Sequence, residues 1–169
     1  MNPTLELLNR RRSLRAYSDQ PITAEEKEAI LQGAFRAPTA GAMQLYTILE
    51  VADPALKERL VETCDHQPFI AKAPLVLLFL ADYQRWWDVF NYSGAPERAR
   101  ELGRDARAPQ VGDLMLACCD ALIAAQTAAI AAEALGIGSC YIGDILEHYE
   151  IHREMFDLPQ YALPIAMLC

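Results

Sequence analysis

The chain has 169 residues and a mass of 18.8 kDa, which suits one domain and leaves little room for two. Apolar residues make up 53% and charged residues 22%, so the composition excludes a disordered or low-complexity chain. The formal net charge of −8 disfavours a general nucleic-acid binder and a protein held at an anionic membrane surface.

Capping signals mark the helices of the first half of the chain. They stand at Asn2-Pro3, at Thr23 with Glu26 (a capping box) and at Asp53-Pro54. The first two helices should end near Arg12 and before Pro38, and the third should carry Leu56, Leu60 and Val61 on one face. Residues 46–51 are rich in β-branched and aromatic side chains, which predicts a strand. Residues 74–81 form a continuous apolar run that is typical of a strand buried on both faces.

The second half is dominated by one long helix. Residues 109–135 are alanine-rich and apolar nearly all round, so we expect a central helix, with Gly136 and Gly138 at its end. Before it, residues 83–108 predict a short aromatic helix and then a mobile stretch. After it we expect a short strand at 139–142, an amphipathic helix at 145–156 and a last strand at 161–169. This order predicts an α+β fold with helices packed on a sheet, rather than a Rossmann unit.

The remaining composition signals point to the cytoplasm. The N-terminus has no apolar region of the secretory kind, and the longest charge-free part of the apolar stretch, 121–132, is too short to cross a bilayer. Five cysteines without a CxxC motif suggest reduced thiols. His148 and His152 are spaced for a shared metal ion, but neighbouring glutamates favour a charged helix face, and we expect no metal site.

Residues 10–15, Arg-Arg-Arg-Ser-Leu-Arg, concentrate positive charge in an acidic chain. They hold four of the fifteen basic residues, so the rest of the chain carries −12. One interpretation is a site for a compact anion such as phosphate, since the planar guanidinium donates paired hydrogen bonds. The other is a solvated group of arginines at a helix end, favoured by the helix dipole. Four arginines do not make the basic face that nucleic acid needs.

Two further segments suit close contact with a flat ligand. Residues 36–44, Arg-Ala-Pro-Thr-Ala-Gly-Ala-Met-Gln, form a loop of small residues that starts at a proline. Residues 136–144 carry three glycines, which either end a helix or expose backbone N–H groups to a cofactor. The chain has no GxGxxG after a strand, no P-loop, no nucleophile elbow and no HExxH.

Taken in order, these segments resemble the FMN-dependent nitroreductase family along nearly the whole chain. Arg11-Arg-Ser-Leu-Arg-Ala-Tyr17 is similar to the family's N-terminal signature, and Arg36-Ala-Pro-Thr-Ala-Gly-Ala-Met-Gln44 to its proline loop. Ala73-Pro74 before a strand that ends in Ala81-Asp82, and Ala132-Glu-Ala-Leu-Gly-Ile-Gly-Ser-Cys-Tyr-Ile-Gly143 followed by Leu158-Pro159, complete the match. The resemblance implies a nitroreductase-like fold over residues 1–169, with a mixed, mainly antiparallel sheet and a long buried helix.

The resemblance also implies a role for each candidate residue. The FMN phosphate falls to Arg11, Arg12, Ser13 and Arg15. Pro38, Thr39, Ala40 and Gln44 would contact the FMN across the dimer interface, as residues contributed by the partner subunit. Gln67 would place donors against the flavin pyrimidine, and Tyr141, Ile142 and Gly143 would present backbone near flavin N5. No catalytic side chain is implied, because the flavin itself carries the hydride.

The activity implied is that of an NAD(P)H-dependent oxidoreductase, a homodimer with FMN at the subunit interface. NADH or NADPH reduces the flavin and leaves, and a nitroaromatic, quinone or related electrophile then takes its place, in a ping-pong mechanism. Alternatives are a flavin carrier or sensor without such turnover, and a cofactor-free module that dimerises through residues 109–135.

The sequence also departs from the family pattern. Ala42, Leu45 and Tyr46 replace the loop's usual Asn, Pro and Trp, and Asp144 follows Gly143, where we expect it to cap the next helix. The family's C-terminal tail has no counterpart, so we expect weaker FMN retention than in a full-length relative. Trp86, Trp87, Phe90 and Tyr92 either form a lid over the substrate pocket or fill a satellite core or the dimer interface. Arg98, Arg100, Arg104 and Arg107 either attract nucleotide phosphates or lie on a solvated face.

Overall fold

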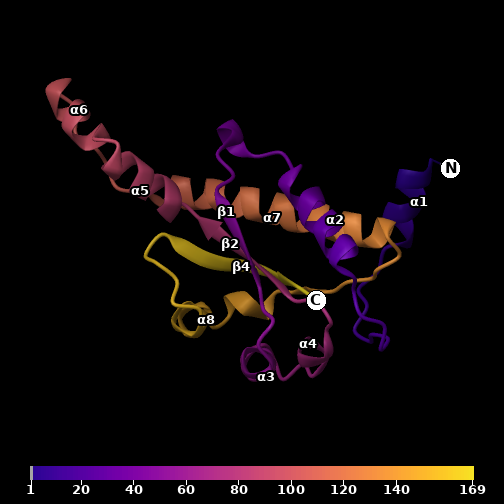
Figure 1. Ribbon diagram of the computed structural model, residues 1–169. Coiled ribbons are helices and arrows are strands. Elements are labelled where there is room, and N and C mark those ends of the chain that lie inside the picture. The colour runs from indigo at the N-terminus through magenta and orange to yellow at the C-terminus, as the bar shows by residue number, and fades with distance from the viewer. Residues whose placement is uncertain (1) are drawn as a thin grey trace.

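The computed structural model describes residues 2–169 and shows one antiparallel sheet between two helical layers (Figure 1). The strands are β1 (Tyr46–Glu50), β2 (Leu77–Asp82), β3 (Tyr141–Ile142) and β4 (Ala162–Leu168). The α-helices are α1 (Pro3–Arg10), α2 (Ala24–Phe35), α3 (Pro54–Thr63), α4 (Phe69–Lys72), α5 (Gln84–Tyr92), α6 (Ala95–Glu101), α7 (Val111–Ala134) and α8 (Tyr149–Met155). Two short 3-10 helices, η1 (Ala40–Ala42) and η2 (Asp144–Leu146), complete the elements.

The predicted helix starts are confirmed. The Asn2 side chain accepts a hydrogen bond from the Thr4 N–H, and Asp53 caps α3 in the same way. At α2, Thr23 and Glu26 bond each other's backbone N–H groups, which is the full capping box. Each cap satisfies donors that the first helical turn leaves free, so local sequence determines where these helices begin.

The strand order is β1-β2-β4-β3, and every strand pair in the described residues is antiparallel. Tyr46 of β1 pairs with Ala81, and Leu168 of β4 pairs with both Leu77 and Tyr141. The start of β1 and the short strand β3 therefore lie toward opposite ends of β2. The four residue steps along β2 from Leu77 to Ala81 amount to roughly 13 Å.

The central helix α7 packs on one face of the sheet through its alanines. Ala121, Ala124, Ala125, Ala128 and Ala132 are all buried there, together with Phe79 of β2 and residues of α2. Small side chains let the helix lie close to the sheet, which confirms the predicted central position. Within residues 2–169, α7 is the one helix long and apolar enough to cross a bilayer, but its alanine face is packed against the sheet.

The other face of the sheet is covered by α3, α4, η2 and α8, with Leu60, Ile70, Leu78 and Met167 in that core. His152 of α8 lies fully buried here. Its Nδ1 lies 2.8 Å from the Ile145 carbonyl oxygen and its Nε2 2.8 Å from the Thr63 hydroxyl. His152 thus joins α8 to η2 and α3, rather than sitting on the charged helix face expected for it.

The structure differs from the prediction in three segments. Residues 95–101, which we expected to be mobile, form the helix α6, and α5 and α6 extend away from the body beyond one end of α7 (Figure 1). The helix expected at 145–156 is divided into η2 and α8. The short helix α4 was not predicted, because four residues are too few for a periodic signal.

Candidate functional site

The arginine segment runs beside the strand that follows α7, although about 125 residues separate them in the chain. The backbone N–H of Leu14 donates to the Ser139 carbonyl oxygen at 3.0 Å. The Leu14 side chain fills the space beside Gly138, where an added Cβ would lie only 2.1 Å from Leu14 Cδ1. Gly138 is therefore needed for close packing, and this packing places residues 11–15 along β3.

The positive charge of this segment is largely uncompensated by the protein. Arg10 lies 3.8 Å from the Glu133 carboxylate, and the Arg15 guanidinium lies over the Phe69 ring at 6.0 Å. In residues 2–169, Arg11 and Arg12 form no ion pair, and Arg12, Ser13 and Arg15 are exposed. Free guanidinium groups beside a hydroxyl suit a phosphate ligand.

Gln67 approaches the same edge from the loop between α3 and α4. Its Nε2 donates to the Cys64 carbonyl oxygen at 3.1 Å and to the Asp144 carboxylate at 3.0 Å. The prediction that Asp144 caps the next helix is wrong: Gly143 is the N-cap residue of η2, and no side chain makes the capping bond. The Asp144 carboxylate accepts from Gln67 instead.

The residues of β3 provide a strand edge with open space beside it. Ile142 is buried in the core, whereas a Cβ at Gly143 would meet nothing within 4 Å. The Tyr141 hydroxyl is buried without a hydrogen-bond partner in the described residues, and burial raises the pKa of Tyr141 to about 12, with Arg11 acting in the opposite direction. We call residues 11–15, 139–143 and Gln67 the arginine edge.

The other predicted residues, Pro38, Thr39, Ala40 and Gln44, lie in the loop before β1, and a buried carboxylate holds them. The Thr39 hydroxyl and the backbone N–H groups of Ala40 and Leu45 all donate to Asp120 of α7, the two N–H groups at 3.0 Å. The Gln44 N–H donates in turn to the Thr39 hydroxyl at 2.8 Å. We call residues 38–45 together with Asp120 the loop end.

The importance of Asp120 did not emerge from the sequence. It is 2% exposed and lies on the same helix face as Ala117 and Ala124. A charged residue at helical spacing within a buried alanine stripe is the signal that could have revealed it, since a buried carboxylate needs hydrogen-bond donors. The loop of residues 38–45 supplies these donors.

The arginine edge and the loop end lie far apart within one chain. Asp120 holds the loop end, and Glu133 pairs with Arg10, which directly precedes the arginine edge. Thirteen residues of α7 separate Asp120 from Glu133, or about 20 Å of helix. The sheet register gives the same answer. The loop end leads into Tyr46 of β1, which pairs with Ala81 of β2, whereas β3 in the arginine edge pairs with Leu168 at the other end of the sheet. The structure therefore groups the twelve predicted residues into two sets, and one chain does not bring them together.

Helix α5 supports the loop end through its first residues. The Trp86 indole N–H donates to the Met43 carbonyl oxygen at 2.8 Å, and the Arg85 guanidinium donates to the carbonyl oxygens of Met43 and Gln44. Trp87 packs edge-on against Tyr161 with ring centroids 5.7 Å apart. Both tryptophans thus join α5 to the body, which favours the core interpretation for them, while Tyr92 is 91% exposed.

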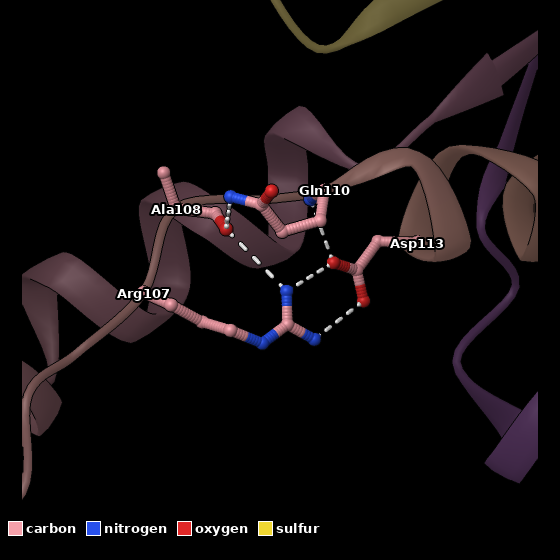
Figure 2. Close-up of polar contacts among 4 residues, drawn as sticks. All are labelled: Arg107, Ala108, Gln110 and Asp113. Carbon is pink, nitrogen blue, oxygen red and sulfur yellow. Dashed lines mark hydrogen bonds and ion pairs between the residues drawn. The ribbon is translucent and has the colours of Figure 1, made fainter.

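Two of the arginines between α5 and α7 are neutralised locally. Arg107 forms an ion pair with Asp113, whose carboxylate also accepts the Gln110 N–H at the start of α7 (Figure 2). Arg100 pairs with Glu97. These pairs favour the solvated-face interpretation for Arg100 and Arg107.

A cavity of about 390 Å³ lies beside the arginine segment. It is lined by Leu14, Tyr17, Ile30, Leu75, Ile137 and neighbouring residues, and by none of the twelve predicted ones. Of the arginine edge, Leu14 and Ser139 are the residues that line this cavity.

Comparison with known proteins relates the whole chain to one family. The family model described as "Nitroreductase family" matches residues 8–169. An FMN reductase (NADPH) of Bacillus subtilis is 34% identical over 98% of this chain and 64% of its own length. An oxygen-insensitive NADPH nitroreductase of Salmonella typhimurium is 34% identical over 100% of this chain and 65% of its own length. The chain thus spans just under two thirds of these curated relatives.

A solved structure gives the same relation for the fold. NADPH:FMN oxidoreductase from Vibrio harveyi complexed with NAD+ superposes with a TM-score of 0.88 at 26% identity. The superposition covers 99% of this chain and 67% of that one. The helix-rich fold with an antiparallel sheet and a long central helix is therefore confirmed as the fold of this family.

Proposed function

The chain belongs to the nitroreductase family, and from this premise we propose that it is an FMN-dependent oxidoreductase. Its electron donor would be NADH or NADPH, and its acceptors nitroaromatics, quinones or related electrophiles. The observation that supports this most is the arginine edge. There, Arg11 and Arg12 form no ion pair within residues 2–169 and lie with the Ser13 hydroxyl beside β3.

The residues of the arginine edge fit the chemical parts of FMN. Arg11, Arg12, Ser13 and Arg15 would hold the phosphate, because no ion pair among residues 2–169 neutralises Arg11, Arg12 or Arg15. Gly143 has room for a flat ring to approach the backbone. Bound FMN would supply the hydride-transfer chemistry, while the protein binds and orients it. Gln67 and the backbone of Tyr141 and Ile142 would position the ring.

We propose that a homodimer completes the site. Pro38, Thr39, Ala40 and Gln44 lie too far from the arginine edge to contact the same ligand within one chain, so a two-fold partner would bring them there. The outer face of α7 suits such contact, because Met115, Leu122 and Ile123 are exposed there, at 64%, 47% and 40%. Exposed apolar side chains in one stripe mark an interaction surface.

The first test is FMN binding. Wild-type protein should bind FMN, and Arg15→Ala should weaken binding by about tenfold or more, because a charge-assisted hydrogen bond contributes about 1.5–3 kcal/mol. Arg104→Ala is the matched control, since it removes an exposed arginine outside the arginine edge. FMN titration by fluorescence quenching measures both. Equal losses in the two variants would contradict the phosphate assignment.

The second test is reduction under anaerobic conditions. Bleaching of the FMN absorbance by NADH or NADPH, with recovery on adding a quinone or nitroaromatic, would support an oxidoreductase. A yellow protein that neither nucleotide bleaches would instead be a flavin carrier or sensor. A colourless dimer that takes up no FMN would be a cofactor-free dimerisation module.

The dimer has its own test. Ile123→Glu places a charge on the outer face of α7 and should shift the protein toward monomer in analytical ultracentrifugation, with loss of FMN affinity. Thr127→Glu on the same helix is not a suitable control, because its hydroxyl bonds the Ile123 carbonyl oxygen. Glu58→Gln on α3, which covers the opposite side of the sheet, is better. A dimer that survives Ile123→Glu would contradict this interface.

We also propose that residues 1–169 act as one domain and that the protein is cytoplasmic. The two cores on either face of one sheet support the first proposal. Three of the five cysteines, Cys64, Cys140 and Cys169, are buried free thiols, which supports the second.

A further inference from the structure

The side-chain amide of Gln67 has a fixed orientation. Its two acceptor partners, the Cys64 carbonyl oxygen and the Asp144 carboxylate, accept hydrogen bonds from Nε2 at 3.1 and 3.0 Å. Neither partner can donate, so the amide cannot be turned over without placing oxygen against oxygen. Both Nε2 protons are used, and Oε1 has no partner within residues 2–169.

The backbone before Gln67 is held in an uncommon conformation. Asp65 and His66 have φ values of 54° and 51°, in the left-handed region that few residues other than glycine occupy. Two such residues in succession turn the chain sharply between α3 and α4. Strained backbone of this kind persists where surrounding structure holds it, and it is concentrated at functional sites. Here it brings Gln67 against Asp144, 77 residues further along.

We propose that Asp144 is a positioning residue that holds Gln67 with its amide oxygen toward the ligand. The ligand must then present an N–H donor at this point, and the chemical class that fits is a cyclic imide, such as the pyrimidine ring of a flavin. This inference rests on the proposed function. It reverses the expectation that Gln67 offers donors, because Asp144 and Cys64 already accept both of them.

The fixed orientation of the Gln67 amide, which we call the lock, can be tested without any cofactor. In nuclear magnetic resonance spectra of the ligand-free protein, the side-chain NH₂ of Gln67 should exchange slowly with water, because both protons are bonded. Gln67→Glu identifies the signal by its loss. Asp144→Ala should speed exchange at least severalfold, whereas Asp144→Asn, whose amide oxygen still accepts, should restore most of the protection.

Glu147→Gln is the matched control for charge. Glu147 is an exposed carboxylate three residues from Asp144, and no hydrogen bond joins its side chain to Gln67 in the described residues. Exchange of the Gln67 amide in this variant should equal that of the wild type. An unchanged exchange rate in Asp144→Ala would overturn the lock whether or not FMN binds.

The consequence for the ligand is tested with FMN and its N3-methyl derivative, which lacks the imide proton. Asp144→Ala should weaken FMN about two- to tenfold, the loss of about one neutral hydrogen bond, and change N3-methyl-FMN less than twofold. Comparing the two ligands in the two proteins isolates the coupling, as in a double-mutant cycle. Asp144→Asn should keep the wild-type pattern.

The outcomes separate this inference from the proposed function. Equal weakening of both ligands in Asp144→Ala would overturn the imide assignment. Equal effects of Asp144→Asn and Asp144→Ala would assign the effect to charge and also overturn it. A protein that binds neither flavin but shows a protected Gln67 amide would contradict the proposed function and the imide assignment, while leaving the lock intact.

Discussion

The arginine edge and the loop end lie at opposite ends of one sheet, and their charged groups differ in how far the chain's own groups neutralise them. At the loop end the Asp120 carboxylate is buried and accepts three hydrogen bonds from its own chain. At the arginine edge, Arg11 and Arg12 form no ion pair among residues 2–169. The first arrangement stabilises the fold, and the second leaves positive charge that a bound phosphate would neutralise under the proposed function. Substitutions at the two ends should therefore separate stability from binding.

The largest expected effect is at the loop end. Asp120→Ala removes the acceptor of the Thr39 hydroxyl and of two backbone N–H groups, and unsatisfied buried donors cost about 1–3 kcal/mol each. We expect the free energy of unfolding to fall by about 3–5 kcal/mol in urea denaturation, since partial rearrangement of the loop offsets some of the loss.

Glu133→Ala is the control on the same helix. Its carboxylate lies 3.8 Å from a mostly exposed Arg10 side chain, so we expect a loss of at most about 1 kcal/mol. Similar losses in the two variants would show that burial and hydrogen bonding of Asp120 do not dominate the stability of this helix.

The second prediction concerns the packing that places the arginine edge. Gly138→Ala puts a methyl group 2.1 Å from Leu14 Cδ1 and 3.0 Å from its Cγ, so Leu14 must move. Overpacking of this kind costs about 1–3 kcal/mol. Because the Leu14 N–H bonds Ser139, we also expect the arginines to shift and FMN affinity to fall severalfold.

A second substitution checks this reason. Leu14→Ala removes the clashing atoms, so Leu14→Ala with Gly138→Ala should recover part of what Gly138→Ala loses. Gly143→Ala, where a Cβ meets nothing within 4 Å, should leave stability nearly unchanged. A double variant less stable than both single ones would contradict the steric explanation.

These two regions also show what the sequence could predict. Local sequence patterns predict the N-terminal caps of α1, α2 and α3, the buried strand β2 and the alanine helix, and these are confirmed. The arginine cluster stood out by charge alone. By contrast, the fit of Gly138 against Leu14, the anchoring of the loop by Asp120 and the bond from Gln67 to Asp144 join residues about 75 to 125 positions apart. Such contacts depend on sheet register and helix rotation, which local patterns do not specify.

The third prediction is that the stability of the protein depends on pH through the buried His152. Burial lowers the pKa of His152, although the hydrogen bond to the Ile145 carbonyl oxygen opposes the shift. In the unfolded chain a histidine takes up a proton near pH 6.5, while folded His152 resists it. The stability is therefore fully present above about pH 6.5 and falls as the pH drops toward the lower folded pKa.

Urea denaturation at several pH values measures this effect. One proton limits its slope to about 1.4 kcal/mol per pH unit. His152→Gln should lower stability at neutral pH and remove this contribution to the slope. His66→Asn, at an exposed position, should keep it. A slope that persists in His152→Gln would assign the acid sensitivity to carboxylates instead.

The smallest expected effect is at the start of α7, seven residues before Asp120. The Asp113 carboxylate there is paired with Arg107 and accepts the Gln110 N–H at 2.8 Å (Figure 2). Asp113→Ala should cost about 1 kcal/mol, the usual contribution of a helix cap. Arg107→Ala should cost less, because its side chain is exposed and salt screens the pair, while Asp113 still caps the helix. Thermal unfolding at low and high salt separates the two contributions. If Arg107→Ala matched Asp113→Ala at high salt, the ion pair rather than the cap would stabilise this end of the helix. Asp113, whose side chain is 14% exposed, would then stabilise α7 in a different way from the buried Asp120.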